Sequence, residues 1–257
     1  MLKKLRREDY HHIDIPGKVT IITGASAGIG LTTARRFAAA GAKLVLVARS
    51  ADKLAALAEE LAGQGHDALA LPADMRDPAA VERMIEQAFE HYGRIDILIN
   101  NAGQAARGAV AQVSPDDYRQ IIELNLFGPL YAIQAAVPKM RQGGGGLIIN
   151  ISSMVTKMHI PGLAAYASTK SALNMLSDTS RVELAADNIR VITVYPRHTA
   201  TDFGKNSLGN QWMRQGQRGH GAPGAPVGRP TADSPELVAD RILEAAQREP
   251  QEQFMDA

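Results

Sequence analysis

The chain has 257 residues, of which 45% are hydrophobic and 21% are charged, and it carries a net charge of +1. These values are normal for one globular α/β domain with a large core, and they exclude a disordered chain and a strongly basic nucleic-acid-binding protein. The sequence has no cysteine, which excludes disulfides and thiolate metal sites and fits a reducing compartment. We therefore expect a cytoplasmic protein without a bound metal.

The N-terminus is basic, like the start of a signal peptide, but acidic and polar residues follow it over Glu8–His12 in place of an apolar core. We therefore expect residues 1–16 to form a solvated arm, without a signal peptide or a membrane anchor. No later apolar run approaches the roughly 18 residues that a membrane span requires, so no span is expected.

Short runs rich in Val, Ile and Leu alternate with amphipathic stretches along most of the chain. The predicted strands are Lys18–Thr23, Lys43–Ala48, Asp67–Leu71, Ile95–Ile99, Leu147–Ile151, Arg190–Val194 and an edge strand over Gln251–Met255. The predicted helices are Ile29–Ala40, Ala51–Ala62, Pro78–Tyr92, Pro115–Met140, Leu163–Ala186 and a last one from Ser234 to about Arg248. This alternation predicts a single α/β domain over residues 1–257, with a Rossmann-like, doubly wound parallel sheet of about seven strands and helices on both faces. Ligands bind beyond the carboxyl ends of the strands in such sheets.

Residues 203–231 interrupt this alternation with many Gly and Pro residues and no clear period. Loops of this length in a compact domain are usually functional, so we expect a substrate lid. The apolar side chains of Phe203, Leu208, Trp212 and Met213 suit either an apolar substrate or contact with another subunit, and the sequence does not decide between them.

The first predicted strand runs into Thr23-Gly24-Ala25-Ser26-Ala27-Gly28-Ile29-Gly30, and a helix follows directly. Glycines at such a turn let the backbone approach a pyrophosphate, which then lies at the positive N-terminus of the helix. The spacing differs from the better-known G-x-G-x-x-G fingerprint, and no Gly-Lys-Ser/Thr ending is present, which excludes a nucleotide triphosphatase loop. An ordinary strand-to-helix turn is the alternative, but the position after the first strand favours a dinucleotide site.

The end of the second predicted strand indicates which dinucleotide binds. An NAD site usually offers a carboxylate there to the ribose 2′-hydroxyl, whereas this chain has Ala48 and then Arg49. Arg49 could bind a 2′-phosphate, with Ser26 and Ser50 as further donors. Alternatively, Arg49 only caps a solvated loop. We expect NADP(H), with NAD(H) as the less favoured cofactor.

Tyr166 and Lys170 lie one helical turn apart in a predicted helix, so their side chains share one face. A free tyrosine has a pKa of about 10, and a nearby ammonium group lowers that pKa toward the range that is useful for proton transfer. The spacing alone is also typical of a solvated helix face. Ser153, however, follows the fifth predicted strand and so lies at the edge of the sheet where ligands bind.

Together these features resemble the short-chain dehydrogenase/reductase family, from the glycine turn to the last helix. The matching motifs are Thr23-Gly24-x-x-x-Gly28-x-Gly30, Asp74 after the third strand, Asn100-Asn101-Ala102-Gly103 after the fourth, Glu123-Leu124-Asn125, and Ser153 with Tyr166 and Lys170. The resemblance implies a catalytic set of Asn125, Ser153, Tyr166 and Lys170. It also implies a cofactor site made of Gly24, Ser26, Gly28, Ile29, Gly30, Arg49, Asp74, Asn101, Ala102, Gly103, Tyr166, Lys170, Pro196, Thr199 and Thr201.

The resemblance implies a role for each catalytic residue. Tyr166 would exchange a proton with the substrate oxygen, and Ser153 would polarise that oxygen. Lys170 would lower the pKa of Tyr166 and hold the nicotinamide ribose, and Asn125 would support a water that links Lys170 to solvent. The implied reaction moves a hydride between the nicotinamide and a small-molecule carbonyl or secondary alcohol.

Two segments depart from the family pattern. Where members usually have Pro-Gly, this chain has Pro196-Arg197. Arg197 either reshapes the substrate side or binds an acidic group; the alternative is that it points to solvent with little effect. The residues Gln253–Ala257 differ from the glycine-rich end of many members, which puts the tetramer interface in doubt. We expect a homo-oligomer, either a tetramer or a dimer that forms through the two long central helices.

Two other functions are possible on such a fold. A non-catalytic dinucleotide-binding redox sensor would have no need of Ser153, Tyr166 and Lys170. An epimerase or dehydratase usually has a different glycine turn and a larger C-terminal substrate domain, which the roughly 25 residues after Thr231 cannot supply. We therefore expect a carbonyl reductase or an alcohol dehydrogenase.

Overall fold

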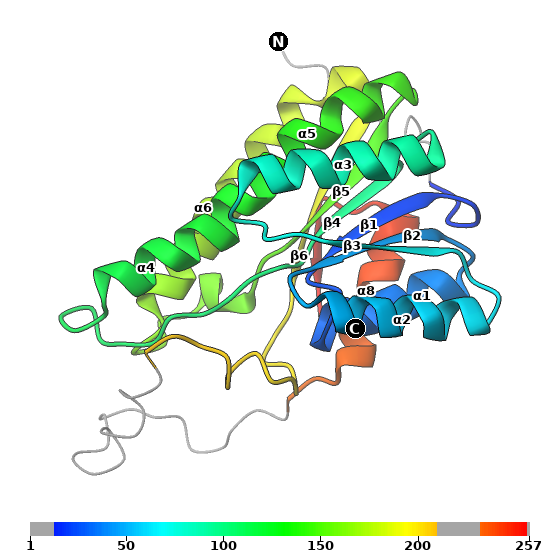
Figure 1. The fold of residues 1–257 in the computed structure, drawn as a ribbon. Coiled ribbons are helices and arrows are strands. Elements are labelled where there is room, and N and C mark those ends of the chain that lie inside the picture. Colours follow the sequence, from blue (N-terminus) through cyan, green and yellow to red (C-terminus); the bar gives the residue numbers. More distant parts are fainter. Residues whose placement is uncertain (1–12, 210–231, 256–257) are drawn as a thin grey trace.

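The computed structural model describes residues 13–209 and 232–255. Most of the expected N-terminal arm and of the expected lid lies outside these residues. The described part forms a layered α/β structure in which one sheet runs through the middle and helices cover both of its faces (Figure 1).

The sheet has seven parallel strands in the order β3-β2-β1-β4-β5-β6-β7, which confirms the predicted fold class. Five of the seven strands are rich in branched apolar residues and almost wholly buried, as is usual for parallel sheets covered on both faces. The strands are β1 (Val19–Thr23), β2 (Lys43–Ala48), β3 (Ala68–Pro72), β4 (Ile97–Asn100), β5 (Gly146–Ile151), β6 (Ile189–Tyr195) and β7 (Glu252–Phe254).

The helices form two layers (Figure 1). One layer consists of α1 (Gly28–Ala39), α2 (Ala51–Gly63) and α8 (Pro235–Arg248), and the other of α3 (Pro78–Tyr92), α4 (Pro115–Ile122), α5 (Gly128–Gln142) and α6 (Ala164–Glu183). Because successive strand residues point to opposite faces, Ile22 packs in the core with α1 and α8, whereas Ile21 packs in the core with α3 and α5.

Side chains at the helix ends explain where several helices begin. Asp77, Ser114 and Ser234 each precede a proline and accept a hydrogen bond from a backbone N–H in the first turn of α3, α4 and α8. This arrangement satisfies an otherwise unpaired donor while the proline supplies a helical φ. At the other end of α3, Gly93 has a φ of 72° and forms the left-handed cap that glycine favours.

The predicted helix over residues 115–140 is interrupted. A π-helical turn, η2 (Glu123–Phe127), joins α4 to α5. Within the described residues, this continuous stretch Pro115–Gln142 is also the one helix that is long and apolar enough to cross a membrane by length and composition. Its mean hydropathy is only 1.2, and Ala136 and Met140 of α5 belong to the core beneath it. A core helix passes the same test, so the stretch is weak evidence for a span.

A buried chain of side-chain amides connects α6 to the sheet. Asn100 Nδ2 at the end of β4 donates to Asn150 Oδ1 on β5, and Asn150 Nδ2 donates to Ser177 Oγ on α6, both over 2.8 Å. All three residues are buried, so each bond forms away from competing water. The chain of bonds fixes α6, which carries Tyr166 and Lys170, against the two strands beside it.

We expect Asn150→Ala to lower the free energy of unfolding by about 3 kcal/mol, because it removes both bonds and leaves the buried Asn100 amide without this partner. Urea unfolding at pH 7, followed by circular dichroism, measures the loss. The control Ser177→Ala removes one of the two hydrogen bonds and should lower the free energy of unfolding by about half as much. Equal stabilities of the wild type and Asn150→Ala would show that the amide chain contributes nothing.

Candidate active site

Four loops at the carboxyl ends of the central strands form the candidate active site. β1 lies between β2 and β4, so the order of the strands changes direction there, and sheets of this kind bind ligands at that point. The glycine turn follows β1, the Asn101–Gly103 loop follows β4, Ser153 follows β5 and Pro196 follows β6. The topology therefore brings together motifs that are far apart in the sequence.

The glycine turn can form only with glycine at its key positions. Gly24 and Gly28 have φ values of 70° and 53°, in the left-handed region that side chains disfavour. At Gly30 a Cβ atom would overlap the carbonyl oxygen of Gly24 and the amide of Asn101. Ser26 is half-buried within the turn. Partly buried Ile29 packs on the core, so that it anchors the start of α1.

The N-terminus of α1 is open to an anion. Its N-cap residue, Ala27, has no side-chain hydrogen bond to the helix, and the first turn of α1 contains no acidic residue. The helix dipole and the first N–H groups therefore face the glycine turn without a competing side chain at these positions. This arrangement fits the pyrophosphate of a dinucleotide.

The loop after β4 supports the glycine turn from the neighbouring strand. Asn101 Nδ2 donates to the carbonyl oxygen of Thr23 at 2.9 Å, and the backbone N–H groups of Asn101 and Ala102 both donate to Thr23 Oγ1 at 3.0 Å. The predicted cofactor motifs on β1 and β4 therefore form one hydrogen-bonded unit.

The residues expected to recognise the adenosine side lie after β2 and β3. Arg49 is exposed directly after β2 and makes no hydrogen bond or ion pair within the described residues. Asp74 is ion-paired with Arg76, with 2.6 Å between Oδ2 and Nη2. The hydrogen bond from Arg76 is the main cause that holds the pKa of Asp74 below its usual value, and the nearby charge of Arg49 lowers that pKa further. Arg76 is not among the predicted site residues, although its position two residues after Asp74 was a usable signal.

Ser153 and Tyr166 lie together at the carboxyl edge of β5. Ser153 caps the short 3₁₀ helix η3 (Met154–Lys157), where its Oγ accepts a bond from the backbone N–H of Val155 at 3.2 Å. Tyr166 lies in the first turn of α6 and is 9% exposed. Burial raises the pKa of Tyr166 to about 12, although its hydrogen bond with Ser153 lowers that pKa. The hydroxyl is therefore protonated at neutral pH and suited to donate a proton.

Lys170 lies one turn after Tyr166 on α6, and its Nζ donates to the carbonyl oxygen of Ile151 at 2.8 Å. That Lys170 lowers the pKa of Tyr166 stays a prediction. Lys170 is itself 4% exposed, and burial lowers its pKa to about 8. Both side chains are thus pushed toward their neutral forms by the same low-dielectric surroundings.

Asn125 lies in the π-helical turn η2 and is completely buried. Its Oδ1 accepts a bond from the backbone N–H of Gln104 at 2.9 Å, and its Nδ2 donates to the carbonyl oxygen of Gln104 at 2.8 Å and to Thr169 Oγ1 at 3.1 Å. A Cβ atom at Gly103 would lie 3.2 Å from Asn125 Oδ1 and 3.5 Å from Lys170 Nζ, so this glycine lies between the two side chains. The sequence alone does not point to Gln104.

The loop after β6 runs from Pro196 over the glycine turn. The carbonyl oxygen of Pro196 accepts a bond from Met154 N–H at 2.9 Å. Thr199 Oγ1 donates to the carbonyl oxygen of Arg197 at 3.0 Å within the loop. Further along, a Cβ atom at Gly28 would lie 3.2 Å from the methyl group of Thr201. Three of the predicted cofactor residues thus lie on a loop that reaches both Met154 and the glycine turn.

Arg197 has a structural partner that neither interpretation of the sequence included. Its Nε and Nη2 atoms each lie 3.1 Å from a carboxylate oxygen of Asp233, which is 8% exposed. Backbone bonds from Ala200 N–H to Asp233 and from Asp233 N–H to His198 reinforce the contact. Arg197 therefore ties the loop after β6 to the segment that precedes α8.

The described part of the expected lid begins beside Tyr166. The rings of Phe203 and Tyr166 lie 5.6 Å apart between centroids, and Phe203 is 39% exposed. The segment 203–209 pairs with the loop after β4 through an isolated bridge between Ala106 and Leu208. Trp212 and Met213 lie outside the described residues.

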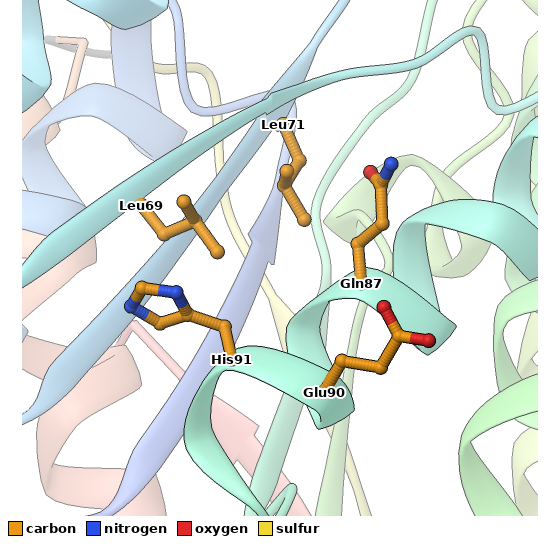
Figure 2. A pocket seen from close by; sticks show the side chains of 5 residues that line it. All are labelled: Leu69, Leu71, Gln87, Glu90 and His91. Atoms are coloured by element: carbon orange, nitrogen blue, oxygen red, sulfur yellow. The ribbon is translucent and has the colours of Figure 1, made fainter.

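A depression of about 340 Å³ lies elsewhere, between the edge strand β3 and α3. Figure 2 shows its lining, with Leu69 and Leu71 from β3 and Gln87, Glu90 and His91 from α3. None of the predicted site residues lines it. Across residues 13–209 and 232–255, no group of three or more His, Asp or Glu side chains could hold a metal ion.

Comparison with known proteins gives consistent matches. The sequence model of the short chain dehydrogenase family matches residues 18–212. Dehydrogenase/reductase SDR family member 7B of Bos taurus is 35% identical over 214 residues, which are 81% of this chain and 65% of the bovine protein. The chain thus spans slightly under two thirds of that relative's length.

Solved structures match over almost the whole chain. An alcohol dehydrogenase from Thermococcus sibiricus, complexed with 5-hydroxy-NADP, has a TM-score of 0.77 and 28% identity, and the match covers 92% of this chain and 94% of that one. A 3-ketoacyl-(acyl-carrier-protein) reductase from Brucella melitensis, complexed with NADH, has a TM-score of 0.79 and 26% identity, with 93% and 97% covered. Similar structures therefore hold either cofactor.

We expect the buried Lys170 ammonium to destabilise the fold at neutral pH. Because its folded-state pKa of about 8 lies below the usual 10.5, the unfolded chain binds more protons between these values, and the stability of the wild type rises with pH across this window. Relative to Lys170→Met, the wild type should gain about 2 kcal/mol between pH 7 and pH 10. Urea unfolding at both pH values measures this gain.

The control for this measurement is Lys53→Met, which removes an exposed lysine on α2. A difference between the wild type and Lys170→Met that does not change with pH would mean that burial does not lower the pKa of Lys170.

Proposed function

The chain belongs to the short-chain dehydrogenase/reductase family and is an oxidoreductase of this family, and on that premise we propose that it uses NADP(H) to interconvert a carbonyl compound and a secondary alcohol. Tyr166 is the general acid/base of this proposal. The observation that carries it is the hydrogen bond between buried Tyr166 and half-buried Ser153 at the carboxyl edge of β5, the same edge of the sheet at which the glycine turn follows β1.

The residues present fit a dinucleotide. The lack of side chains at Gly24 and Gly30 lets the turn pack closely against Asn101, and the N-terminus of α1 that follows the turn has no capping side chain. The Asn101–Gly103 loop, Lys170 and the loop containing Pro196, Thr199 and Thr201 border the same edge of the sheet. The bound nicotinamide would supply or accept the hydride.

The chain's own residues handle the proton. In the reducing direction, Ser153 Oγ donates a hydrogen bond to the carbonyl oxygen and stabilises the negative charge that develops there. Tyr166 gives its hydroxyl proton to that oxygen, so the product is an alcohol and Tyr166 is left as a phenolate. Lys170 lies one turn along α6, and its pKa of about 8 makes it a stronger acid than a free lysine. We propose that Lys170 returns the proton to Tyr166, with Asn125 supporting the water that connects Lys170 to solvent.

The preference for NADP(H) rests on the surroundings of Arg49. β2 ends in Ala48, so no carboxylate is placed there for a ribose 2′-hydroxyl, and the carboxylate of Asp74 is already paired with Arg76. Arg49 is exposed beside Asp74 and can form charge-assisted hydrogen bonds to a 2′-phosphate. Solved relatives hold either cofactor, so the discrimination in this chain depends on its own residues.

Location and assembly are further parts of the proposal. We propose a cytoplasmic protein, because a cysteine-free chain suits a reducing compartment. We also propose a homo-oligomer formed through the long central helices. Met175 and Val182 of α6 are 67% and 68% exposed and lie two turns apart on one face, where a second copy would cover them. No observation favours the non-catalytic sensor.

We expect Arg49→Ala to weaken NADPH binding by about 10- to 100-fold and to leave NADH binding unchanged, because only NADPH carries the 2′-phosphate. Titrations followed by nicotinamide fluorescence measure both dissociation constants. Lys53→Ala, which removes an exposed cation on α2, is the control. Equal affinity of the wild type for the two cofactors would remove the proposed role of Arg49, and binding of neither would overturn the dinucleotide site.

We expect Tyr166→Phe to lower kcat by about 100- to 10,000-fold, because the substrate oxygen loses its proton donor. The variant should bind NADPH within a factor of about two of the wild type, since the phenyl ring keeps the packing. A panel of ketones, with NADPH oxidation followed by absorbance, measures the loss. Retention of most of the activity would assign the proton transfer to another group.

A further inference from the structure

The hydrogen bonds around Gln104 connect the catalytic centre to the segment 203–209. We propose that Gln104 is a positioning residue whose side chain holds this segment so that Phe203 packs against Tyr166 and forms an apolar wall of the substrate site. This inference rests on the proposed function, because the wall acts on the substrate of that reaction. In this proposal Gln104 does not contact the reacting atoms, because its effect on the substrate passes through Asn206 and Phe203.

The backbone of Gln104 is fixed by Asn125. The Gln104 N–H donates to Asn125 Oδ1 at 2.9 Å, and the Gln104 carbonyl oxygen accepts from Asn125 Nδ2 at 2.8 Å. Asn125 is completely buried, so water does not compete for these two bonds. The side-chain amide of Asn125 therefore holds the peptide units on both sides of the Gln104 Cα atom. This fixes the direction in which the Gln104 side chain leaves the loop.

The side chain of Gln104 reaches the segment 203–209. Its Nε2 donates to the carbonyl oxygen of Asn206 at 2.7 Å, across 102 positions of sequence. Asn206 N–H donates to Asp202 at 3.1 Å, so the bond from Gln104 acts on a turn that contains Phe203. The direction of that turn determines where the Phe203 ring lies.

The remainder of the segment is anchored without Gln104. Leu208 N–H donates to Ala105 at 2.8 Å, and Arg107 N–H donates to Leu208 at 2.9 Å. The Leu208 side chain also packs in a small apolar cluster with Ala106 and Ile121. Loss of the Gln104 side-chain bond should therefore release the turn around Phe203 and leave the Leu208 end in place.

Phe203 is placed to contact a substrate. Its ring centroid lies 5.6 Å from that of Tyr166, and the 39% of the residue that remains exposed borders the side chain that exchanges the proton. Ala105 and Val155 are buried against Tyr166 in the same neighbourhood. This apolar lining predicts a carbonyl substrate with a sizeable apolar group, and a small ketone would gain little from the Phe203 wall.

The first test is Gln104→Met, which keeps the length of the side chain but cannot donate a hydrogen bond. Purified full-length protein is examined by hydrogen–deuterium exchange without any ligand. We expect faster exchange at the amides of Lys205 and Asn206 and unchanged exchange at Leu208. The control is Gln87→Met on α3, which lies in the separate depression shown in Figure 2. Unchanged exchange across residues 203–208 in Gln104→Met would overturn the proposal.

The second test is kinetic and uses NADPH with an aryl ketone, acetophenone, and a small ketone, acetone. We expect Gln104→Met to raise KM for acetophenone by about 2- to 10-fold, as loss of one hydrogen bond predicts, with kcat within about twofold and KM for acetone unchanged. Gln104→Lys, which can again donate to Asn206, should restore the wild-type KM. A fall in kcat alone, or an equal rise of KM for both ketones, would overturn the positioning role.

A double-mutant cycle separates this route from other effects. Phe203→Ala should raise KM for acetophenone, and adding Gln104→Met to it should raise KM no further, because both changes remove the same wall. Additive effects would contradict the route through Phe203. If the wild type reduces neither ketone nor any other carbonyl compound, the proposed function fails, while the exchange measurement still decides whether Gln104 holds the segment.

Discussion

The buried amide of Asn125 holds the active-site region together. It bonds to both sides of Gln104 in the loop after β4 and to the hydroxyl of Thr169 on α6, which in turn donates to the carbonyl oxygen of Tyr166. Both N–H donors and the oxygen of this amide are therefore used, and the side chain is completely buried. The π-helical turn η2 aims the side chain between the two segments, as π turns often do at functional sites.

Burial has opposite effects on the two titratable groups of α6. It raises the pKa of Tyr166 to about 12 and lowers that of Lys170 to about 8. The lysine ammonium is therefore the stronger acid of the two in the folded protein, whereas the two groups have similar pKa values in water. A tyrosine that holds its proton is suited to protonate a carbonyl oxygen as a hydride arrives at the carbon, and a lysine that releases its proton more readily is suited to reprotonate the tyrosine. In the proposed reaction, the packing around α6 therefore favours proton transfer from Lys170 to Tyr166.

Much of the fold is visible in the sequence because its signals are local. Helix α3 begins at Pro78 and ends at Tyr92 as predicted, since Asp77-Pro78 and Gly93 mark its ends. The hydrogen-bond partners of the site residues are not visible in the sequence, because they are not local. Gln104 meets Asn206, and Arg197 meets Asp233, across long stretches of chain, so no periodicity or local spacing reveals them. The π-helical turn inside the residues 115–142 is likewise invisible, because the apolar pattern continues through it.

The bond between Asn101 and Thr23 has a consequence for the order in which the domain assembles during translation. The two residues are 78 positions apart, so Thr23 at the end of β1 cannot accept this hydrogen bond until Asn101 has left the ribosome. By then β2 and β3 have also emerged, so the half of the sheet that carries the glycine turn can complete itself first. The helix with Tyr166 and Lys170 leaves the ribosome later, when the strands β1 to β5 have already been synthesised.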